Sequence, residues 1–190
     1  MVNRALLTPE ECCLHIVDPQ QSLMKHIHEQ QRVSAVIRLM VESARILHLP
    51  LIANTQYEKG LGPYVEELDS ILEGVPKIDK TEFCSCRNRK TVQAINGLPG
   101  RVHTVLLVGV ETHICIYQTA VGYLEMGMTP WIVADGVSSR TEANHRLGLR
   151  RLEKLGAIVG PAEMIIYELV ARAGTPSFKA ILPHVVNCTF

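Results

Sequence analysis

The sequence predicts an α/β domain in which helices cover both faces of a mainly parallel sheet. The chain has 190 residues, of which 47% are hydrophobic and 20% are charged, and this composition fits one compact core. Short apolar runs alternate along the chain with longer segments of helical periodicity. That alternation is typical of parallel strands joined by crossover helices. We therefore expect a single domain over residues 1–190.

Five short runs, and a weaker sixth, are the expected strands. The sixth run, residues 78–80, lies in an irregular segment, residues 59–88, that glycine and proline interrupt. The other five are apolar or rich in β-branched residues, as expected of buried strands. They are residues 14–17, 51–55, 105–110, 131–134 and 157–159.

Four segments have the pattern of helices. Residues 33–47 carry apolar side chains at spacings of three and four, and this stripe ends before Pro50. Residues 114–126 and 142–155 are each followed by a glycine, and the second segment has basic side chains near its end. Residues 162–171 follow a proline and form the last expected helix.

Charge and hydropathy exclude several classes of function. The 19 basic and 19 acidic residues balance, and no run of five or six like charges is present, so we expect neither nucleic acid nor a membrane surface as a partner. No segment approaches the roughly 18–20 apolar residues of a membrane-spanning helix, and we expect no cleaved signal. The six cysteines lack the spacing of a disulfide framework. We expect a cytoplasmic protein with reduced thiols.

Three reactive side chains lie where predicted strands stop. Asp18 directly follows the first strand, Lys80 closes the weak strand, and Cys115 comes a short turn after residues 105–110. In an open α/β sheet, ligands bind outside the carboxyl ends of the strands. We therefore expect the three side chains to converge on one crevice.

The chemistry of these three groups is compatible. A free thiol has a pKa near ~8.5, and a nearby cation or helix N-terminus lowers that pKa and activates the sulfur. We expect Lys80 and the start of helix 114–126 to act in this way on Cys115, while Asp18 accepts the thiol proton and returns it to a leaving amine. Backbone N–H groups of residues 111–115 would bind the oxyanion. Spacing alone leaves a second interpretation open, in which Cys115 is a small buried hydrophobic residue.

Five motifs carry a resemblance to a known family. They are Asp18-Pro19-Gln20, Asn54-Thr55-Gln56-Tyr57 with Gly60 and Gly62, Asp79-Lys80-Thr81-Glu82-Phe83, Gly109-Val110-Glu111-Thr112-His113-Ile114-Cys115 with Gln118-Thr119-Ala120, and Ala134-Asp135 with Ser138-Ser139-Arg140. Their order resembles the isochorismatase-like hydrolases over essentially the whole chain. The closing Pro176-Ser177-Phe178-Lys179 is similar to the small metal-free branch that contains the YcaC-type and isochorismatase-domain-containing proteins.

The resemblance implies a fold and a set of site residues. The fold is a three-layer domain with about six strands in the order 3-2-1-4-5-6. Asp18, Lys80 and Cys115 match the family's catalytic triad. The family also has a non-proline cis peptide before the cysteine, which falls at Val110–Glu111 in this chain and directs the N–H groups of Glu111 and Cys115 at the oxyanion.

The resemblance further implies hydrolysis of a small amide-like substrate through a covalent thioester, without a cofactor, in a homo-oligomer. Nicotinamidases of the wider superfamily carry an Asp-x-His metal pair after the second strand, whereas this chain has Gln56-Tyr57-Glu58 there, so we expect no metal. Two alternatives stay open: a catalytically silent binding or scaffold protein, and a vinyl-ether hydrolase of the isochorismate type. Vinyl-ether hydrolases often lack the nucleophilic cysteine, so Cys115 favours acyl transfer.

Gln20, Gln56 and His113 are the expected substrate-binding residues. The two glutamines lie just beyond strand ends, where their amides can orient Asp18 or hold a substrate carbonyl. His113 has two interpretations, a donor to the substrate or a buried side chain bonded to backbone.

Other groups favour structural explanations. His26 and His28 fit a solvated loop better than a metal site. Cys84 and Cys86 are separated by one residue, so we expect both on the same face of an extended segment. They could form a redox pair, but we favour the interpretation in which they have no chemical role. Asp135 fits an Asp-Gly turn followed by a salt bridge from Arg140. No G-x-G-x-x-G motif follows a strand, which argues against dinucleotide binding.

Overall fold

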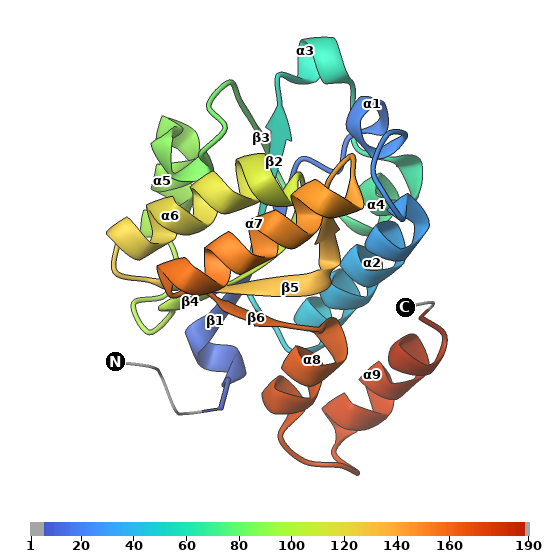
Figure 1. Cartoon of the computed structure of the whole chain (residues 1–190). Helices are drawn as coiled ribbons and strands as arrows, with labels where there is room; N and C mark the ends of the chain where they lie inside the picture. Colours follow the sequence, from blue (N-terminus) through green and yellow to red (C-terminus); the bar gives the residue numbers. More distant parts are fainter. Residues whose placement is uncertain (1–5, 189–190) are drawn as a thin grey trace.

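A computed structural model of the chain describes residues 6–188 and has an α/β fold of three layers (Figure 1). Six strands form one sheet, in which every neighbouring pair is parallel. Their order is β3-β2-β1-β4-β5-β6, which confirms the predicted fold class and strand order. The strands are β1 (Cys12–Val17), β2 (Leu51–Gln56), β3 (Lys77–Lys80), β4 (Thr104–Val110), β5 (Thr129–Ser138) and β6 (Ile158–Gly160).

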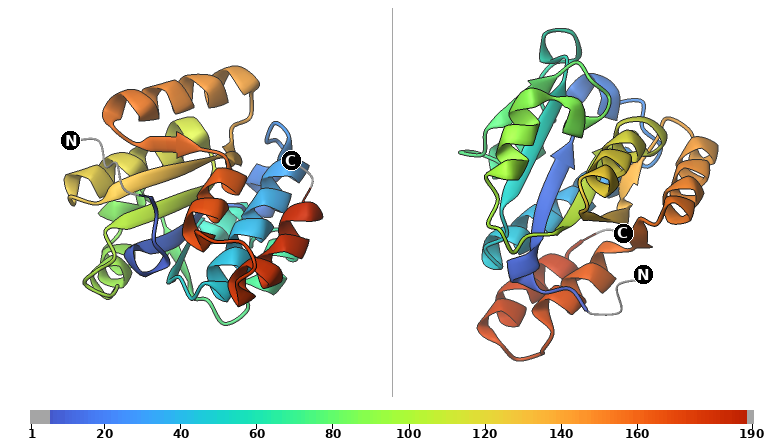
Figure 2. Two further views of the ribbon diagram at one scale, coloured as in Figure 1. Left: turned by 90° about the horizontal axis from the view of Figure 1, so that it is seen from below. Right: turned by 90° about the vertical axis from the view of Figure 1, so that its left-hand side faces the viewer.

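Helices cover both faces of the sheet (Figure 2). One core contains side chains from α2, α4, α8 and α9, and the other contains side chains from α5, α6 and α7. Along β1, Leu14 and Ile16 join the first core, whereas Cys13 and Val17 join the second, because successive side chains of a strand point to opposite faces. The helices are α1 (Gln21–Met24), α2 (Gln30–Ile46), α3 (Glu58–Leu61), α4 (Glu66–Ile71), α5 (Arg89–Asn96), α6 (Tyr117–Glu125), α7 (Glu142–Leu155), α8 (Ala162–Val170) and α9 (Pro176–Val186).

All six predicted strands are present, and three of the four predicted helices correspond to α2, α7 and α8. The predicted helix 114–126 is divided into two parts. A π-helical turn, Thr112–Ile116, comes first, and α6 continues from it. Cys115 therefore lies in the π-helical turn rather than in regular α-helix.

The expected turn at Asp135 is wrong, because Asp135 and Gly136 lie inside β5. Leu107 pairs with Ile132, but Gly109 pairs with Val137, so β5 bulges between these positions. The Asp135 carboxylate accepts a hydrogen bond from the backbone N–H of Ala162 at 2.8 Å, at the start of α8. Extra residues in one strand form a bulge without ending the strand.

Five helices, α1, α3, α4, α5 and α9, were not predicted. Asn88 caps α5 by accepting hydrogen bonds from the N–H groups of Lys90 and Thr91. α9 has Pro176 in its first turn and Pro183 in its interior. Because proline usually interrupts helices, these two residues made the segment look non-helical in the sequence.

The described part of the chain, residues 6–188, has no helix that is both long enough and apolar enough to cross a membrane. Within the same residues, no three His, Cys, Asp or Glu side chains gather as the ligands of a metal ion do. All six cysteines are free.

A buried histidine connects the neighbouring strands β1 and β2 to α6. His15 Nε2 lies 2.6 Å from Asn54 Oδ1, and His15 Nδ1 lies 2.8 Å from the hydroxyl of Tyr123. Asn54 Nδ2 donates to the carbonyl of Ile78 and to Thr91 Oγ1, so its Oδ1 faces His15 as an acceptor. His15 Nε2 therefore carries the hydrogen, and Nδ1 accepts from Tyr123. Burial lowers the pKa of His15 to about 4.

This depressed pKa predicts that acid destabilises the fold through His15. Between pH 6.5 and about 4 the unfolded chain binds a proton at this side chain and the folded chain does not, so the free energy of unfolding falls as pH falls through this window. The full loss is about 3 kcal/mol. His15→Gln keeps a donor for Asn54 but does not titrate, so its unfolding free energy should fall less.

Urea unfolding between pH 7.5 and 4 measures this difference. His184→Gln, at an exposed position, is the matched control and should follow the wild type. An equal pH dependence in wild type and His15→Gln would contradict the assignment.

Candidate active site

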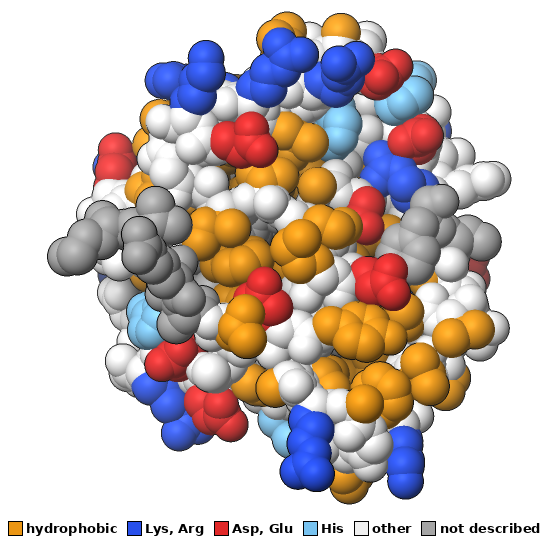
Figure 3. Space-filling view, turned by 60° about the horizontal axis from the view of Figure 1, so that its bottom comes forward, with side chains coloured by type: hydrophobic (Ala, Val, Ile, Leu, Met, Phe, Trp, Pro, Cys, Tyr) orange, Lys and Arg blue, Asp and Glu red, His pale blue; other side chains and the backbone are white. Residues whose placement is uncertain are grey.

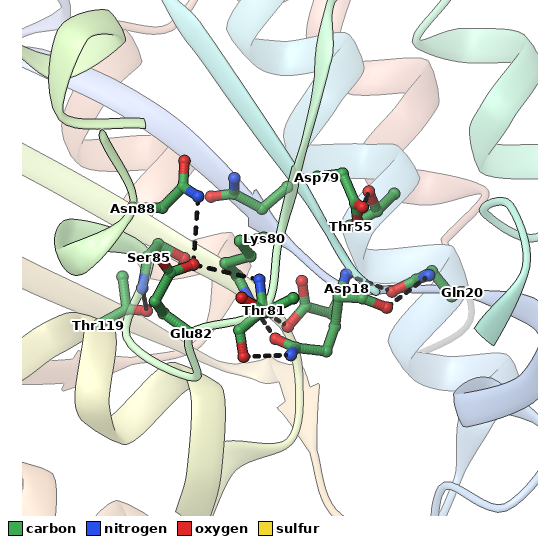
Figure 4. A network of polar contacts seen from close by, with 12 residues as sticks. Asp18, Gln20, Thr55, Asp79, Lys80, Thr81, Glu82, Ser85, Asn88 and Thr119 are labelled. Atoms are coloured by element: carbon green, nitrogen blue, oxygen red, sulfur yellow. Dashed lines mark hydrogen bonds and ion pairs between the residues drawn. The ribbon is translucent and has the colours of Figure 1, made fainter. Parts of the chain in front are cut away.

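A buried ion pair joins the carboxyl ends of β1 and β3. Lys80, the last residue of β3, donates from Nζ to Asp18 Oδ2 at 2.7 Å, and both side chains are fully buried (Figure 4). Asp18 directly follows β1 and has a φ of 55°, a left-handed conformation that aspartate tolerates better than most residues. Taking each ion out of water costs several kcal/mol, so the surroundings must satisfy both charges.

Two glutamines support this ion pair. Lys80 Nζ also donates to Gln56 Oε1 at 2.7 Å, and Gln56 Nε2 donates to the carbonyl of Thr81 at 2.9 Å. Gln20 donates to the carbonyls of Gln56 and Gly62 at 3.1 and 2.7 Å and accepts from the N–H of Gln56 at 2.7 Å. Gln56 therefore orients the Lys80 ammonium, while Gln20 ties the loop after β1 to the end of β2. Both amides, predicted to bind substrate, are occupied by protein groups.

The turn after β4 carries Cys115. β4 ends at Val110, and the peptide bond between Val110 and Glu111 is cis. The π-helical turn Thr112–Ile116 follows and holds Cys115, which is 6% exposed. The Glu111 carboxylate accepts from the backbone N–H of Arg140 at 2.9 Å and from its Nε at 3.2 Å. The predicted salt bridge of Arg140 is therefore present, and it fixes the turn against the chain that follows β5.

Gly109 lets β4 come close to β1 beside the site. It has a φ of 120°, and a Cβ at this position would collide with the carbonyl oxygen of Val17. Only glycine allows both this conformation and this approach. Because Val17 precedes Asp18, the contact draws the segment that bears Asp18 toward the segment that leads to Cys115.

Cys115 is protonated at rest. Burial raises the pKa of its thiol, and the charge of Asp18 raises it further, while Lys80 opposes both. The predicted lowering of this pKa is therefore wrong, because burial removes most of the contact of Cys115 with water and Asp18 already balances the charge of Lys80.

Asp18 is the base that the thiol faces. Burial raises the pKa of Asp18, although Lys80 and a hydrogen bond from Cys115 act to lower it. Its Oδ1 is buried and has no well-formed hydrogen bond to any residue between 6 and 188. The structure thus brings the three predicted residues together. The protonated thiol of Cys115 lies beside the carboxylate of Asp18, which is paired with Lys80 through one oxygen and can accept a proton on the other.

His113 lies at a cleft beside the turn. Its Nδ1 is 2.9 Å from the Ser139 hydroxyl. The cleft has a volume of about 270 Å³ and is lined by His113, Tyr117, Asn144, Leu147, Gly148 and Arg151. His113 and Tyr117 flank Cys115 in the chain, so the cleft borders the segment that carries the thiol. A larger hollow of about 610 Å³ between α2 and α9 has no residue of the triad in its lining.

Sequence reasoning missed Asn54 and Tyr64. The Tyr64 hydroxyl donates to the carbonyl of Asn54 at 2.5 Å and lies 3.2 Å from the carbonyl oxygen of Ile16, so it joins β1 to β2 next to Asp18. The available signal was the polar run Asn54-Thr55-Gln56 at the end of a predicted buried strand.

The chain is similar to one family along most of its length. The family model described as the isochorismatase domain matches residues 12–164. The secreted isochorismatase effector Isc1 of Phytophthora sojae (strain P6497) is 33% identical over 178 residues, which cover 92% of this chain and 84% of that protein.

Two solved structures share the fold. A structure described as the MAR1 ribonuclease of Caenorhabditis elegans has a TM-score of 0.90 and 32% sequence identity, and the match covers 98% of this chain and 95% of that one. The YcaC gene product of Escherichia coli, described as an octameric hydrolase of unknown specificity, has a TM-score of 0.84 and 21% identity, with 96% and 93% coverage.

The ion pair predicts a strong energetic coupling between its two partners. Asp18→Asn and Lys80→Met each leave the other charge buried without its partner, and each should lower the free energy of unfolding by about 3–5 kcal/mol. The double variant removes both charges and should lose much less than the sum of the two single losses. Urea unfolding of the four proteins measures this coupling.

The exposed pair of Arg87 and Glu125, 2.6 Å apart, is the matched control. Arg87→Met and Glu125→Gln should couple by no more than about 1 kcal/mol. Additive losses at Asp18 and Lys80 would contradict the buried pair.

Proposed function

Because the chain belongs to the isochorismatase family of hydrolases, we propose that it is a cysteine hydrolase that cleaves a small amide-like substrate through a covalent thioester. One observation carries the proposal, namely the buried ion pair of Lys80 and Asp18 beside the Cys115 thiol. A nucleophilic thiol with an adjacent base, and a third group that orients the base, is the arrangement that acyl transfer through sulfur requires. The proposed reaction uses no cofactor.

In the first half of the reaction, Asp18 takes the thiol proton while the sulfur of Cys115 attacks the carbonyl carbon. A C–S bond forms, and the carbonyl electron pair moves onto oxygen. Burial raises the pKa of Asp18, and a carboxylate with a raised pKa is a stronger general base. When the tetrahedral intermediate collapses, the C–N bond breaks and Asp18 returns the proton to the leaving nitrogen. Lys80 balances the negative charge throughout.

In the second half, water replaces the amine. Asp18 takes a proton from water, the water oxygen attacks the thioester carbon, and the C–S bond breaks to release a carboxylic acid and restore the thiol. We assign the N–H groups of Glu111 and Cys115 to the oxyanion in both halves. A single donor of this kind is worth about 10²–10³ in kcat. Gln56 acts through Lys80, and His113 contacts the substrate from the cleft beside the turn.

An amide is favoured over the substrates of other relatives. The Caenorhabditis elegans structure is described as a ribonuclease, but this chain has balanced charge, and Lys80 is committed to Asp18 and Gln56 rather than free to hold a phosphate. Cleavage of a vinyl ether uses water as its nucleophile and needs none from the protein, so it leaves Cys115 without a role. A catalytically silent protein does not need the cost of a buried ion pair.

We also propose that the chain forms a homo-oligomer and works in the cytoplasm. Figure 3 shows apolar side chains gathered over the end of the molecule where α8 and α9 lie, and Met164 and Tyr167 of α8 are 51% and 45% exposed. Patches of this kind mark association surfaces. The octameric state described for the Escherichia coli protein supports the same proposal, which light scattering on the purified chain tests.

The proposed function predicts that amide turnover depends on two residues. With a panel of small primary amides and anilides, Cys115→Ala should lose turnover, and Asp18→Asn should lower kcat/KM by about 10²–10⁴, the usual range for a general acid–base group. Release of ammonia or aniline measures the rate. Acid-quenched wild type should also carry the acyl group on the tryptic peptide that contains Cys115.

Cys188→Ala changes a half-buried thiol on the far segment of the chain and should keep the wild-type rate. Turnover that survives Cys115→Ala would exclude the thioester. Pyruvate release from isochorismate without cleavage of any amide would favour the vinyl-ether reaction, and binding of amides without turnover would favour the silent protein.

A further inference from the structure

Two thiols lie side by side outside the proposed active site. Cys84 and Cys86 flank Ser85 at a 3₁₀ turn, Ser85–Arg87, that packs against α6. A Cβ placed on Gly122 of α6 would lie 2.9 Å from Cys84 Sγ and 3.1 Å from Cys86 Sγ. Both sulfur atoms therefore pack against Gly122, which has no side chain. The expected extended segment is wrong here, because the chain turns at Ser85.

The backbone of this turn has the span that a disulfide needs. The distance between the Cα atoms of Cys84 and Cys86 is set by the dihedral angles of Ser85, and a helical residue at that position gives about 5–6 Å. That value lies within the range of Cα separations in disulfides. An extended residue would place the two Cα atoms farther apart, at the upper limit of the range.

α6 holds the turn in this shape. The backbone N–H of Ser85 donates to Thr119 Oγ1 at 3.0 Å, and that hydroxyl donates to Ser85 Oγ at 3.2 Å (Figure 4). Cys86 Sγ lies 3.7 Å from the carbonyl oxygen of Thr119. Ser85 is buried, whereas Cys84 is only half-buried and so is partly open to solvent.

The two thiols differ in their readiness to ionise. A hydrogen bond from Cys86, together with backbone N–H groups and the charge of Arg87, lowers the pKa of Cys84 to about 6. The same hydrogen bond, with burial, raises the pKa of Cys86. Cys84 is therefore the sulfur of the pair that loses its proton more readily, and Cys86 is the one that keeps it. The pKa of each of the other four cysteines is raised.

We propose that Cys84 and Cys86 form a redox-active dithiol that a hydroperoxide converts into an intramolecular disulfide. The Cys84 thiolate attacks the terminal peroxide oxygen, an S–O bond forms, the O–O bond breaks, and an alcohol or water leaves after gaining a proton from the solvent. The Cys86 sulfur then attacks the Cys84 sulfur, the S–S bond forms, and the oxygen leaves as water with the Cys86 proton. The hydroperoxide is reduced by two electrons, and a small dithiol reverses the change.

This dithiol is separate from the proposed catalytic thiol. Peroxide oxidises thiolates, and Cys115 is a protonated, 6% exposed thiol at rest. Cys84 should therefore react first when peroxide is limiting. The inference does not depend on amide hydrolysis.

A tryptic digest tests the proposal directly, because cleavage after Lys80 and Arg87 gives one peptide that contains both cysteines and no other. The intact protein is treated with limiting hydrogen peroxide, blocked with N-ethylmaleimide and digested. We expect this peptide to lose two hydrogens and to escape alkylation, at a rate at least tenfold above the oxidation of Cys115 or Cys188. Dithiothreitol should restore both thiols.

Two variants separate the roles of the sulfurs. In Cys86→Ser, Cys84 should accumulate as a sulfenic acid that dimedone traps, and in Cys84→Ser, Cys86 should stay reduced. Cys188→Ser, which changes the other half-buried thiol, should leave the reaction unchanged. The proposal is overturned if both cysteines of the wild-type peptide are alkylated after peroxide treatment, or if they oxidise no faster than Cys188.

Discussion

The buried ion pair between Lys80 and Asp18 is the constraint on which the rest of the site depends. Two charges without water need partners in fixed places, and the sheet supplies them from neighbouring strands. Gln56 pairs with Lys80 in the register of β2 and β3, and the N–H of Asp18 donates to the carbonyl of Asn54 at 3.1 Å. Because the strand order is 3-2-1-4, Lys80, Gln56, Asp18 and the turn after β4 meet along one edge of the sheet. The order of the strands is thus what assembles the site.

The same ion pair decides how the thiol works. Burial and the charge of Asp18 raise the pKa of Cys115 more than Lys80 lowers it, so the sulfur rests as a thiol and depends on Asp18 to take its proton. The pKa of Cys84 is shifted in the opposite direction. There a hydrogen bond from the neighbouring thiol, backbone N–H groups and the charge of Arg87 lower the pKa to about 6. Cys115 is suited to attack a carbonyl only when Asp18 takes its proton. Cys84 ionises readily and is suited to react with an oxidant without a base.

Much of this could be predicted from the sequence, because the strands and the triad have local signals. Apolar runs followed at once by Asp18 or Lys80 indicate strand ends, and strand ends indicate the site. The protonation of Cys115 could not be predicted, because it depends on burial and on the distance between Lys80 and Asp18. The bulge at Asp135 depends on pairing with β4, and the 3₁₀ turn at Ser85 depends on Thr119 of α6, so neither has a signal in its own segment.

The central claim is that burial and the charge of Asp18 together keep Cys115 protonated until the thiol attacks. The pH dependence of iodoacetamide alkylation at Cys115, followed by mass spectrometry of its tryptic peptide, tests this claim in wild type and in Asp18→Asn that retains its native circular dichroism. The account predicts an apparent pKa above the ordinary ~8.5 in wild type and a lower one in Asp18→Asn, because loss of the carboxylate leaves Lys80 free to stabilise the thiolate. A wild-type pKa well below ~8.5 that Asp18→Asn leaves unchanged or raises would contradict it and restore a preformed thiolate.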